Sequence, residues 1–292
     1  GKVSPMQQKQ MTTVDEENIF NIAIEGNFDD CQKIVKTLFV DDEIQNRTSL
    51  TAINSINWAR LIAQVVYYFW SHLQINNKDI NFIVPSGNFG NIFSAYVAKQ
   101  MGLPINRLHV ATNENDILKS IITRGQMTKK TVSQTFSPSM DIQISSNFER
   151  QMFESFNRDS NQVNNVFNEF HKTGNYLFNS NIIDNFKKIY DASSINDDET
   201  LVTISKVFEK YNYISDPHTA TGLKLLMDKN DNETWVSLAC AHPAKFNTAV
   251  KKAINKEIDI PSELSNLFDK KENMTILPNS TQEVKNYLLQ NI

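Results

Sequence analysis

Apolar residues recur along this chain with two spacings, one typical of helices and one typical of buried strands. The clearest helix is expected from Trp58 to Leu73, where large apolar side chains recur every three or four positions. The clearest strand is Phe82–Val84, a short apolar run that ends at Pro-Ser-Gly. The same criteria predict further helices over 4–13, 29–39, 92–101, 116–122, 201–211, 220–227, 243–254 and 281–289, and further strands over 19–24, 107–111 and 236–239.

The order of these elements predicts an α/β fold with a parallel-rich sheet flanked by helices. A strand over 80–87, a helix over 92–101 and a strand over 107–111 form a βαβ unit, whose two strands run parallel. The next part of the chain is polar and rich in Asn, with aromatic residues at intervals, and we expect a helical insertion there. Residues 191–198 are expected to form a loop, and residues 261–292 a loosely packed tail with one helix.

Composition narrows the class of protein. The 292 residues are 40% hydrophobic and 21% charged, which fits a globular chain of about two domains. A net charge of −4 without a Lys- or Arg-rich stripe argues against a nucleic-acid partner. No apolar stretch is long enough to span a bilayer, which argues against a membrane protein. Two cysteines without zinc-ligand spacing predict neither a disulfide scaffold nor a metal site, so a reducing cytoplasm is the expected compartment.

The strongest candidate for chemistry is the turn between the strand over 80–87 and the helix that follows it. The turn consists of Ser86, Gly87, Asn88, Phe89, Gly90 and Asn91. Backbone N–H groups at a helix N-terminus favour an anion, and glycine lets the backbone approach it closely. The turn therefore predicts a phosphate site at the carboxyl edge of the sheet, where ligands bind in such folds. It matches neither a dinucleotide motif nor a nucleoside triphosphate motif, and an ordinary βα turn with a capping Asn is the alternative.

Further polar groups lie at the starts of other predicted helices. Cys240 follows a strand and should face the same sheet edge, although a buried core thiol is the commoner fate of a lone cysteine. His218 and His242 are candidates for substrate contact, with a helix-capping or packing role as the alternative for each. Asn57 and Arg60 open the strongest helix, where Arg60 either clamps a phosphate or carboxylate or is a surface residue beside a cap.

Five segments, in this order, carry a resemblance to a known family. They read NSINWAR, VPSGNFGN, ATNENDIL, DPHTATG and CAHPAKF. Together they resemble threonine synthases of the bacterial and fungal type, and the match runs from Gly1 to about Ile254. The resemblance implies a pyridoxal 5'-phosphate (PLP) enzyme of fold type II, the fold of the tryptophan synthase β chain. It implies the conversion of O-phospho-L-homoserine and water to L-threonine and phosphate.

The resemblance also implies roles for individual residues. Gly87 to Asn91 match the family's loop for the cofactor phosphate, in agreement with the interpretation of the turn itself. Cys240 stands where the family usually has a threonine that hydrogen-bonds the pyridine nitrogen, and related serine dehydratases are similar in having cysteine there. Asn57, Arg60 and His218 match positions that are expected to line the substrate side.

One part of the family's machinery has no counterpart in the chain. The Schiff-base lysine of the family lies in a Phe-Lys-Asp stretch followed by a Ser-Gly-Asp-Thr-Gly loop, and neither occurs here. We therefore expect a C-terminal part of a longer protein, without a catalytic residue of its own and inactive alone. In that case residues 1–46 are the remnant of an incomplete small cofactor domain. Residues 47–145 and 200–256 form the large PLP-binding domain, 146–199 the insertion and 257–292 the tail.

Two alternatives stay open on the sequence. One is a non-catalytic protein that keeps the phosphate site and binds PLP or a phosphorylated amino acid. The other is a serine or threonine dehydratase-like lyase, whose only support is Cys240. The expected partner is a small molecule in each case, and the oligomeric state, monomer or homodimer, is left open.

Overall fold

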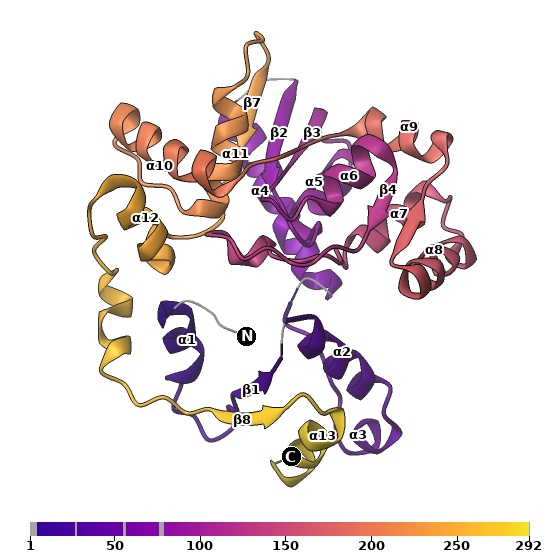
Figure 1. Cartoon of the computed structure of the whole chain (residues 1–292), viewed down its shortest axis with the longest axis vertical. Coiled ribbons are helices and arrows are strands. Elements are labelled where there is room, and N and C mark those ends of the chain that lie inside the picture. The colour runs from indigo at the N-terminus through magenta and orange to yellow at the C-terminus, as the bar shows by residue number, and fades with distance from the viewer. Residues whose placement is uncertain (1–4, 27, 55–56, 76–78, 292) are drawn as a thin grey trace. The chain divides into compact units, whose positions relative to one another are not determined.

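The computed structural model describes residues 5–26, 28–54, 57–75 and 79–291. The chain divides into two compact units, one formed by Gly1–Ala52 with Asp259–Ile292 and the other by Ile53–Ile258. Every candidate site residue lies in the second, larger unit. Figure 1 labels most of the helices and strands of both.

The larger unit is built on a four-stranded parallel sheet in the order β6-β3-β2-β7. Its strands are β2 (Ile80–Pro85), β3 (Ile105–Thr112), β6 (Tyr190–Ser194) and β7 (Thr234–Ser237). The chain runs outward from β2 through β3 to β6 and then places β7 on the other side of β2, so the strand order reverses between β2 and β7. Ligands bind in such sheets outside the carboxyl ends of the strands at a reversal of this kind. The predicted α/β class and parallel sheet are confirmed.

Helices cover both faces of this sheet. Alternate residues of β2 point to opposite faces, and apolar side chains lie on each of them. Phe82 and Val84 share a buried cluster with side chains of α4, α5 and α6, whereas Ile83 packs with Leu225 of α11 on the other face. The helices of this unit are α4 (Trp58–Ile75), α5 (Gly90–Gln100), α6 (Ile117–Arg124), α7 (Phe148–Ser155), α8 (Ser160–Thr173), α9 (Ser180–Ile189), α10 (Asp197–Tyr211), α11 (Pro217–Met227) and α12 (Asn247–Ile254), with the short 3-10 turns η1 (Pro138–Met140) and η2 (Pro243–Phe246).

The segment predicted as a helical insertion contributes a strand to the main sheet as well as helices. Helices α7, α8 and α9 lie in it as expected, but Tyr190–Ser194 forms β6 and pairs in parallel with Leu108–Thr112 of β3. The prediction of a loop over 191–198 is therefore wrong. β6 is an edge strand with polar residues at most positions, so it lacks the apolar run that marks a buried parallel strand. A second, antiparallel pair joins β4 (Gln126–Thr128) to β5 (Asn175–Leu177).

The smaller unit joins the two ends of the chain. Its elements are α1 (Pro5–Thr12), β1 (Ile22–Glu25), α2 (Phe28–Phe39), α3 (Asp42–Arg47), η3 (Ser262–Phe268), β8 (Thr275–Pro278) and α13 (Thr281–Asn291). β1 pairs in parallel with β8, which Figure 1 shows beside it. The segment that we predicted to be a loosely packed tail thus packs with residues 1–52. Val284 of α13 shares a small core with Ile34, Leu38 and Ile44.

Helix α4 has two apolar sides. Leu61, Val65 and Tyr68 lie in the core. The other side exposes large apolar side chains, with exposed fractions from 43 to 70% for Trp58, Ile62, Val66, Trp70 and Leu73. Exposed apolar side chains gathered on one helix face are typical of a site that contacts protein, a ligand or a membrane. Among the described residues, neither α4 nor any other helix has the length and apolar character needed to cross a membrane.

Gly222 lets α11 pack directly on the end of the sheet that carries the candidate turn. A Cβ built on Gly222 would lie 2.5 Å from Ser237 Oγ and 3.0 Å from Pro85 Cγ. Pro85 is the last residue of β2 and precedes the turn at Ser86. The position of the turn therefore depends on the close approach of α11 to β2.

We predict that Gly222→Ala lowers the free energy of unfolding. Overpacking a core site costs about 1–3 kcal/mol, which exceeds the gain of at most about 1 kcal/mol in helix propensity. Urea denaturation measures the difference. The double variant Gly222→Ala with Ser237→Ala should recover part of the loss, because the nearest atom is then gone. A Gly222→Ala protein as stable as the wild type would contradict the close contact.

Candidate functional site

The turn after β2 is held in an unusual backbone conformation. Phe89 adopts φ 64° and ψ −5°, in the left-handed region, which costs a residue with a side chain about 1–2 kcal/mol. Its fully buried ring makes edge contacts with the rings of Phe148 and Tyr190, at centroid distances of 5.1 and 5.4 Å. These aromatic contacts offset the strain and fix the turn.

The same residue leaves the start of α5 without a capping side chain. Phe89 is the N-cap of α5 and makes no side-chain hydrogen bond to the first turn, whereas Asp or Asn side chains cap α8, α9, α10 and α11. The N–H of Phe93 bonds back to the Phe89 carbonyl at 2.9 Å. The N–H groups of Gly90, Asn91 and Ile92 precede it at the positive end of the helix dipole. Donors arranged in this way favour an anion.

The turn is packed against η1 on one side and linked to the chain after η1 on the other. A Cβ built on Gly87 would lie 2.8 Å from Met140 Cα and 3.3 Å from the carbonyl oxygen of Ser139, so a side chain at this position would collide with backbone. Asn88 Oδ1 accepts hydrogen bonds from the N–H and the hydroxyl of Ser146 at 2.7 and 2.6 Å. The geometry of the turn therefore depends on where η1 lies.

Tyr68 connects the start of α5 with the surroundings of Cys240. The Tyr68 hydroxyl lies 2.8 Å from Asn91 Oδ1 and donates a hydrogen bond to Asn91. Burial, and then the neighbouring Cys240 group, raise the pKa of Tyr68 well above its usual value. The phenol therefore remains a donor, and Asn91 Oδ1 accepts from it.

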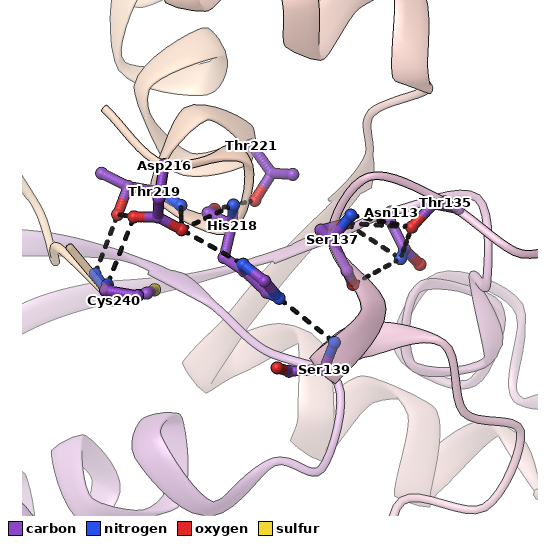
Figure 2. A network of polar contacts seen from close by, with 10 residues as sticks. Asn113, Thr135, Ser137, Ser139, Asp216, His218, Thr219, Thr221 and Cys240 are labelled. Carbon is purple, nitrogen blue, oxygen red and sulfur yellow. Dashed lines mark hydrogen bonds and ion pairs between the residues drawn. The ribbon is translucent and has the colours of Figure 1, made fainter. Parts of the chain in front are cut away.

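Asp216 organises the start of α11 and the loop after β7. Its carboxylate accepts a hydrogen bond from the Thr219 hydroxyl and lies 3.1 Å from His218 Nδ1. It also accepts the N–H groups of His218, Thr219 and Ala241 at 2.9, 3.3 and 3.2 Å. Thr219 Oγ1 accepts the N–H of Cys240 at 2.8 Å, as Figure 2 shows. One carboxylate thus fixes the backbone on both sides of Cys240.

The hydrogen bonds of Asp216 also set its charge. Burial disfavours the ionised carboxylate, but the hydrogen bonds from His218 and Thr219 outweigh that effect and hold the pKa of Asp216 below its usual value. The group is therefore a buried anion at neutral pH, with donors on both oxygens.

His218 spends both ring nitrogens on contacts within the protein. Nε2 lies 3.1 Å from the backbone N of Ser139, which has only a proton to offer, so Nε2 is the acceptor. Nδ1 then carries the ring proton and donates it to Asp216. Figure 2 shows the buried imidazole reaching from Asp216 to Ser139. Both ring nitrogens of His218 are therefore engaged within the protein, and neither is left for the substrate contact that we expected.

A second polar network, which the sequence did not predict, anchors the other side of η1. The Asp141 carboxylate accepts from Asn113 Nδ2 at 2.7 Å, Asn115 Nδ2 at 3.1 Å and Thr135 Oγ1 at 2.7 Å. Asn113 Nδ2 also lies 3.1 Å from Ser137 Oγ, and Figure 2 shows Asn113, Thr135 and Ser137 together. The only available signal was that both asparagines lie in ATNENDIL, directly after β3.

Other sequence candidates have local structural roles. Asn57 Oδ1 accepts the N–H of Ala59 at 2.9 Å and so caps α4, and Arg60 is exposed on the first turn of that helix. His242 is the N-cap of η2, where its Nδ1 accepts the N–H of Ala244 at 3.2 Å. Cys240 is solvent-exposed, so the alternative of a buried core thiol is wrong.

The sequence of this chain is similar to the sequences of known proteins. Residues 219–288 match the family model described as "Threonine synthase, C-terminal". The chain is 42% identical to the threonine synthase of Pseudomonas aeruginosa over 99% of this chain and 63% of that protein. It is 41% identical to the threonine synthase of Saccharomyces cerevisiae over 98% of this chain and 62% of that protein. The chain therefore spans less than two thirds of the length of these relatives.

Solved structures agree with the sequence comparison. The crystal structure of PLP-bound threonine synthase from Brucella melitensis matches with a TM-score of 0.89 and 44% identity, over 100% of this chain and 63% of that one. The yeast threonine synthase structure matches with a TM-score of 0.85 and 39% identity, over 99% of this chain and 62% of that one. These matches confirm the predicted fold type II architecture.

We predict that Asp216→Asn lowers the free energy of unfolding at pH 7 by about 1–3 kcal/mol or more, because an amide NH2 would face donors. The difference should shrink in acid. The pKa of Asp216 is lower in the folded state than its unfolded value of about 3.9. Its stabilisation is therefore complete above about pH 5 and is lost as the pH falls through the folded-state pKa. Urea denaturation at pH 7, 5 and 3 measures this. A difference that is the same at all three values would contradict the assignment.

We also predict slow alkylation of Cys240, although the residue is exposed. Desolvation of the thiol by the protein around it, and then the nearby Asp216 carboxylate, raise the pKa of the Cys240 thiol to about 12, even though the residue as a whole is exposed. Only the thiolate reacts, so iodoacetamide should modify Cys240 in a Cys31→Ser protein at least about tenfold more slowly than free cysteine at pH 8.5. The rate should still be rising at pH 10. Modification as fast as that of free cysteine would rule out the raised pKa.

Proposed function

We propose that this chain belongs to the threonine synthase family and is the PLP-binding part of a threonine synthase. The proposed reaction converts O-phospho-L-homoserine and water to L-threonine and phosphate. The observation that carries the proposal is the start of α5. Its first N–H groups have no capping side chain, and they belong to the segment VPSGNFGN at the carboxyl edge of the sheet.

The residues around this edge fit the cofactor. The turn from Ser86 to Asn91 offers backbone donors at a helix N-terminus, which suits a phosphate group. Cys240 follows the neighbouring strand β7 and carries a thiol that stays protonated at neutral pH. A protonated thiol is a weak, neutral donor for a pyridine nitrogen. When PLP is bound, it supplies the electron sink that the reaction requires.

The chain's own residues would bind and orient the cofactor and the substrate, and would not themselves break bonds of the substrate. Asp216 fixes the backbone at Cys240 through Thr219 and Ala241. On the substrate side, we propose that the exposed guanidinium of Arg60 binds the phosphate or carboxylate of the substrate, with Asn57 next to it at the start of α4. His242 caps η2 through Nδ1, which leaves Nε2 as its nitrogen for a substrate.

We further propose that the active protein contains more polypeptide than this chain. The chain spans 63% of the Pseudomonas relative and contains no Phe-Lys-Asp stretch, so the lysine must be supplied by the remaining part. The exposed apolar side of α4 supports this, because such a surface needs a covering layer. The unit of residues 1–52 and 259–292 would then be part of the small cofactor domain, and the protein would act in the cytoplasm.

The test is reconstitution. We expect the chain alone to bind PLP and to release no phosphate from O-phospho-L-homoserine. Co-expressed with the part of the Pseudomonas aeruginosa enzyme that lies outside the matched region, it should release phosphate and threonine in equal amounts. A folded complex that binds PLP and releases neither product would contradict the proposal. A complex that instead forms ammonia and a keto acid from serine or threonine would establish the dehydratase.

Two matched variants test the role of α4 in the same experiment. Val66 on α4 and Val202 on α10 are both exposed, at 60 and 51%. Val66→Glu should prevent co-purification of the two parts, because a charge would enter the covered face, whereas Val202→Glu should not. Equal co-purification of the two variants would show that this side of α4 is not the contact.

A further inference from the structure

We propose that His218 is a positioning residue that sets the spacing between the two ends of the cofactor site. It would do so by holding η1 against the turn that binds the phosphate, while its partner Asp216 holds the loop that carries Cys240. The inference rests on the proposed function. It replaces the substrate contact that the sequence predicted for His218.

The first link runs from His218 to the turn. His218 Nε2 accepts the N–H of Ser139 at 3.1 Å. Ser139 and Met140 of η1 in turn meet the backbone of Gly87, where a Cβ would lie 2.8 Å from Met140 Cα. The two nearest atoms are backbone atoms of η1, so a displacement of η1 cannot be absorbed by a side-chain rotation there. A shift of Ser139 is therefore transmitted to Gly87 and to the donors that follow it.

The second link runs from His218 to Cys240. The Asp216 carboxylate accepts a hydrogen bond from the Nδ1–H of His218. It also accepts hydrogen bonds from the Ala241 N–H at 3.2 Å and from the Thr219 hydroxyl. Thr219 Oγ1 accepts the Cys240 N–H at 2.8 Å. The same pair of side chains therefore contacts both segments that the cofactor would have to bridge, one after β2 and one after β7.

The ring has to be neutral and buried for this role. Nε2 faces an N–H and must accept, and Nδ1 faces a carboxylate and must donate, so one tautomer satisfies both. Phe246 packs against the ring at a centroid distance of 4.6 Å, and the side chain is almost fully buried. A second ring proton would point at the N–H of Ser139. An imidazole fixed in this way has no lone pair with which to take a proton from a substrate.

Two conservative variants separate the two contacts. In His218→Gln the amide oxygen reaches the position of Nε2 and still accepts from Ser139, while the contact with Asp216 is lost. In His218→Asn the amide NH2 reaches the position of Nδ1 and still donates to Asp216, while the contact with Ser139 is lost. His171→Asn on α8 is the matched control, because His171 is exposed.

Amide hydrogen exchange and PLP binding of the whole chain are the readouts. We expect faster exchange over residues 137–142 and a PLP dissociation constant at least about fivefold higher in His218→Asn. His218→Gln should exchange in this segment as the wild type does, and His171→Asn should match the wild type in both measurements.

The outcomes distinguish this inference from the proposed function. Equal exchange over 137–142 in His218→Asn and His218→Gln would overturn the inference, whatever the chain binds. Faster exchange in His218→Asn with unchanged PLP affinity would also overturn it, because η1 would then not shape the phosphate site. A wild-type chain that fails to bind PLP contradicts the proposed function, and the exchange comparison still decides whether His218 holds η1.

Discussion

Asp216 carries a negative charge at a position that is 1% exposed, and the local structure depends on how that charge is satisfied. A buried carboxylate is costly unless donors surround it. Here three backbone N–H groups, a hydroxyl and an imidazole supply them, from α11 and from the loop after β7. Because these donors come from different segments, satisfying one charge fixes several pieces of backbone at once. The loop of Cys240 and, through His218, the turn η1 take their positions from it.

The sheet explains why this arrangement lies where it does. The strand order reverses between β2 and β7, and in such sheets ligands bind outside the carboxyl ends of the strands at a reversal of this kind. The turn with Phe89 leaves β2, and the loop with Cys240 leaves β7. Gly222 allows α11 to lie close to both strands, which brings Asp216 and His218 within reach of the two segments. Packing, charge and the candidate site are therefore parts of one arrangement.

Sequence reasoning succeeded where a signal is local. The apolar period of α4 and the short run of β2 identify their elements, because side-chain burial on one helix face or in one strand leaves a repeat in the sequence. The turn from Ser86 to Asn91 could be predicted for the same reason, since its glycines and its place after a strand are visible without a structure. Cys240 could be placed at the sheet edge because a strand leads to it.

Prediction from the sequence failed for polar residues and for contacts between residues that lie far apart in the sequence. β6 is a polar edge strand, and β8 pairs with β1 from the other end of the chain, so neither leaves a local periodic pattern. The hydrogen bond from the Ser139 N–H to His218 Nε2 joins residues that lie 79 positions apart in the sequence. No spacing rule predicts which backbone N–H an imidazole accepts from. The left-handed conformation of Phe89 was also hidden, because its cost is offset by rings that come from other elements.

The central claim is that backbone donors of the turn bind the phosphate of PLP. Selective labelling with 15N-glycine tests it directly, because the chain has only 8 glycines and two of them, Gly87 and Gly90, lie in the turn. Titration with PLP should shift the amide signals of these two residues and leave those of Gly102 and Gly174 in place, whereas pyridoxal, which lacks the phosphate, should not shift them. Signals of Gly87 and Gly90 that stay in place with saturating PLP, or that move equally with pyridoxal, would contradict the claim.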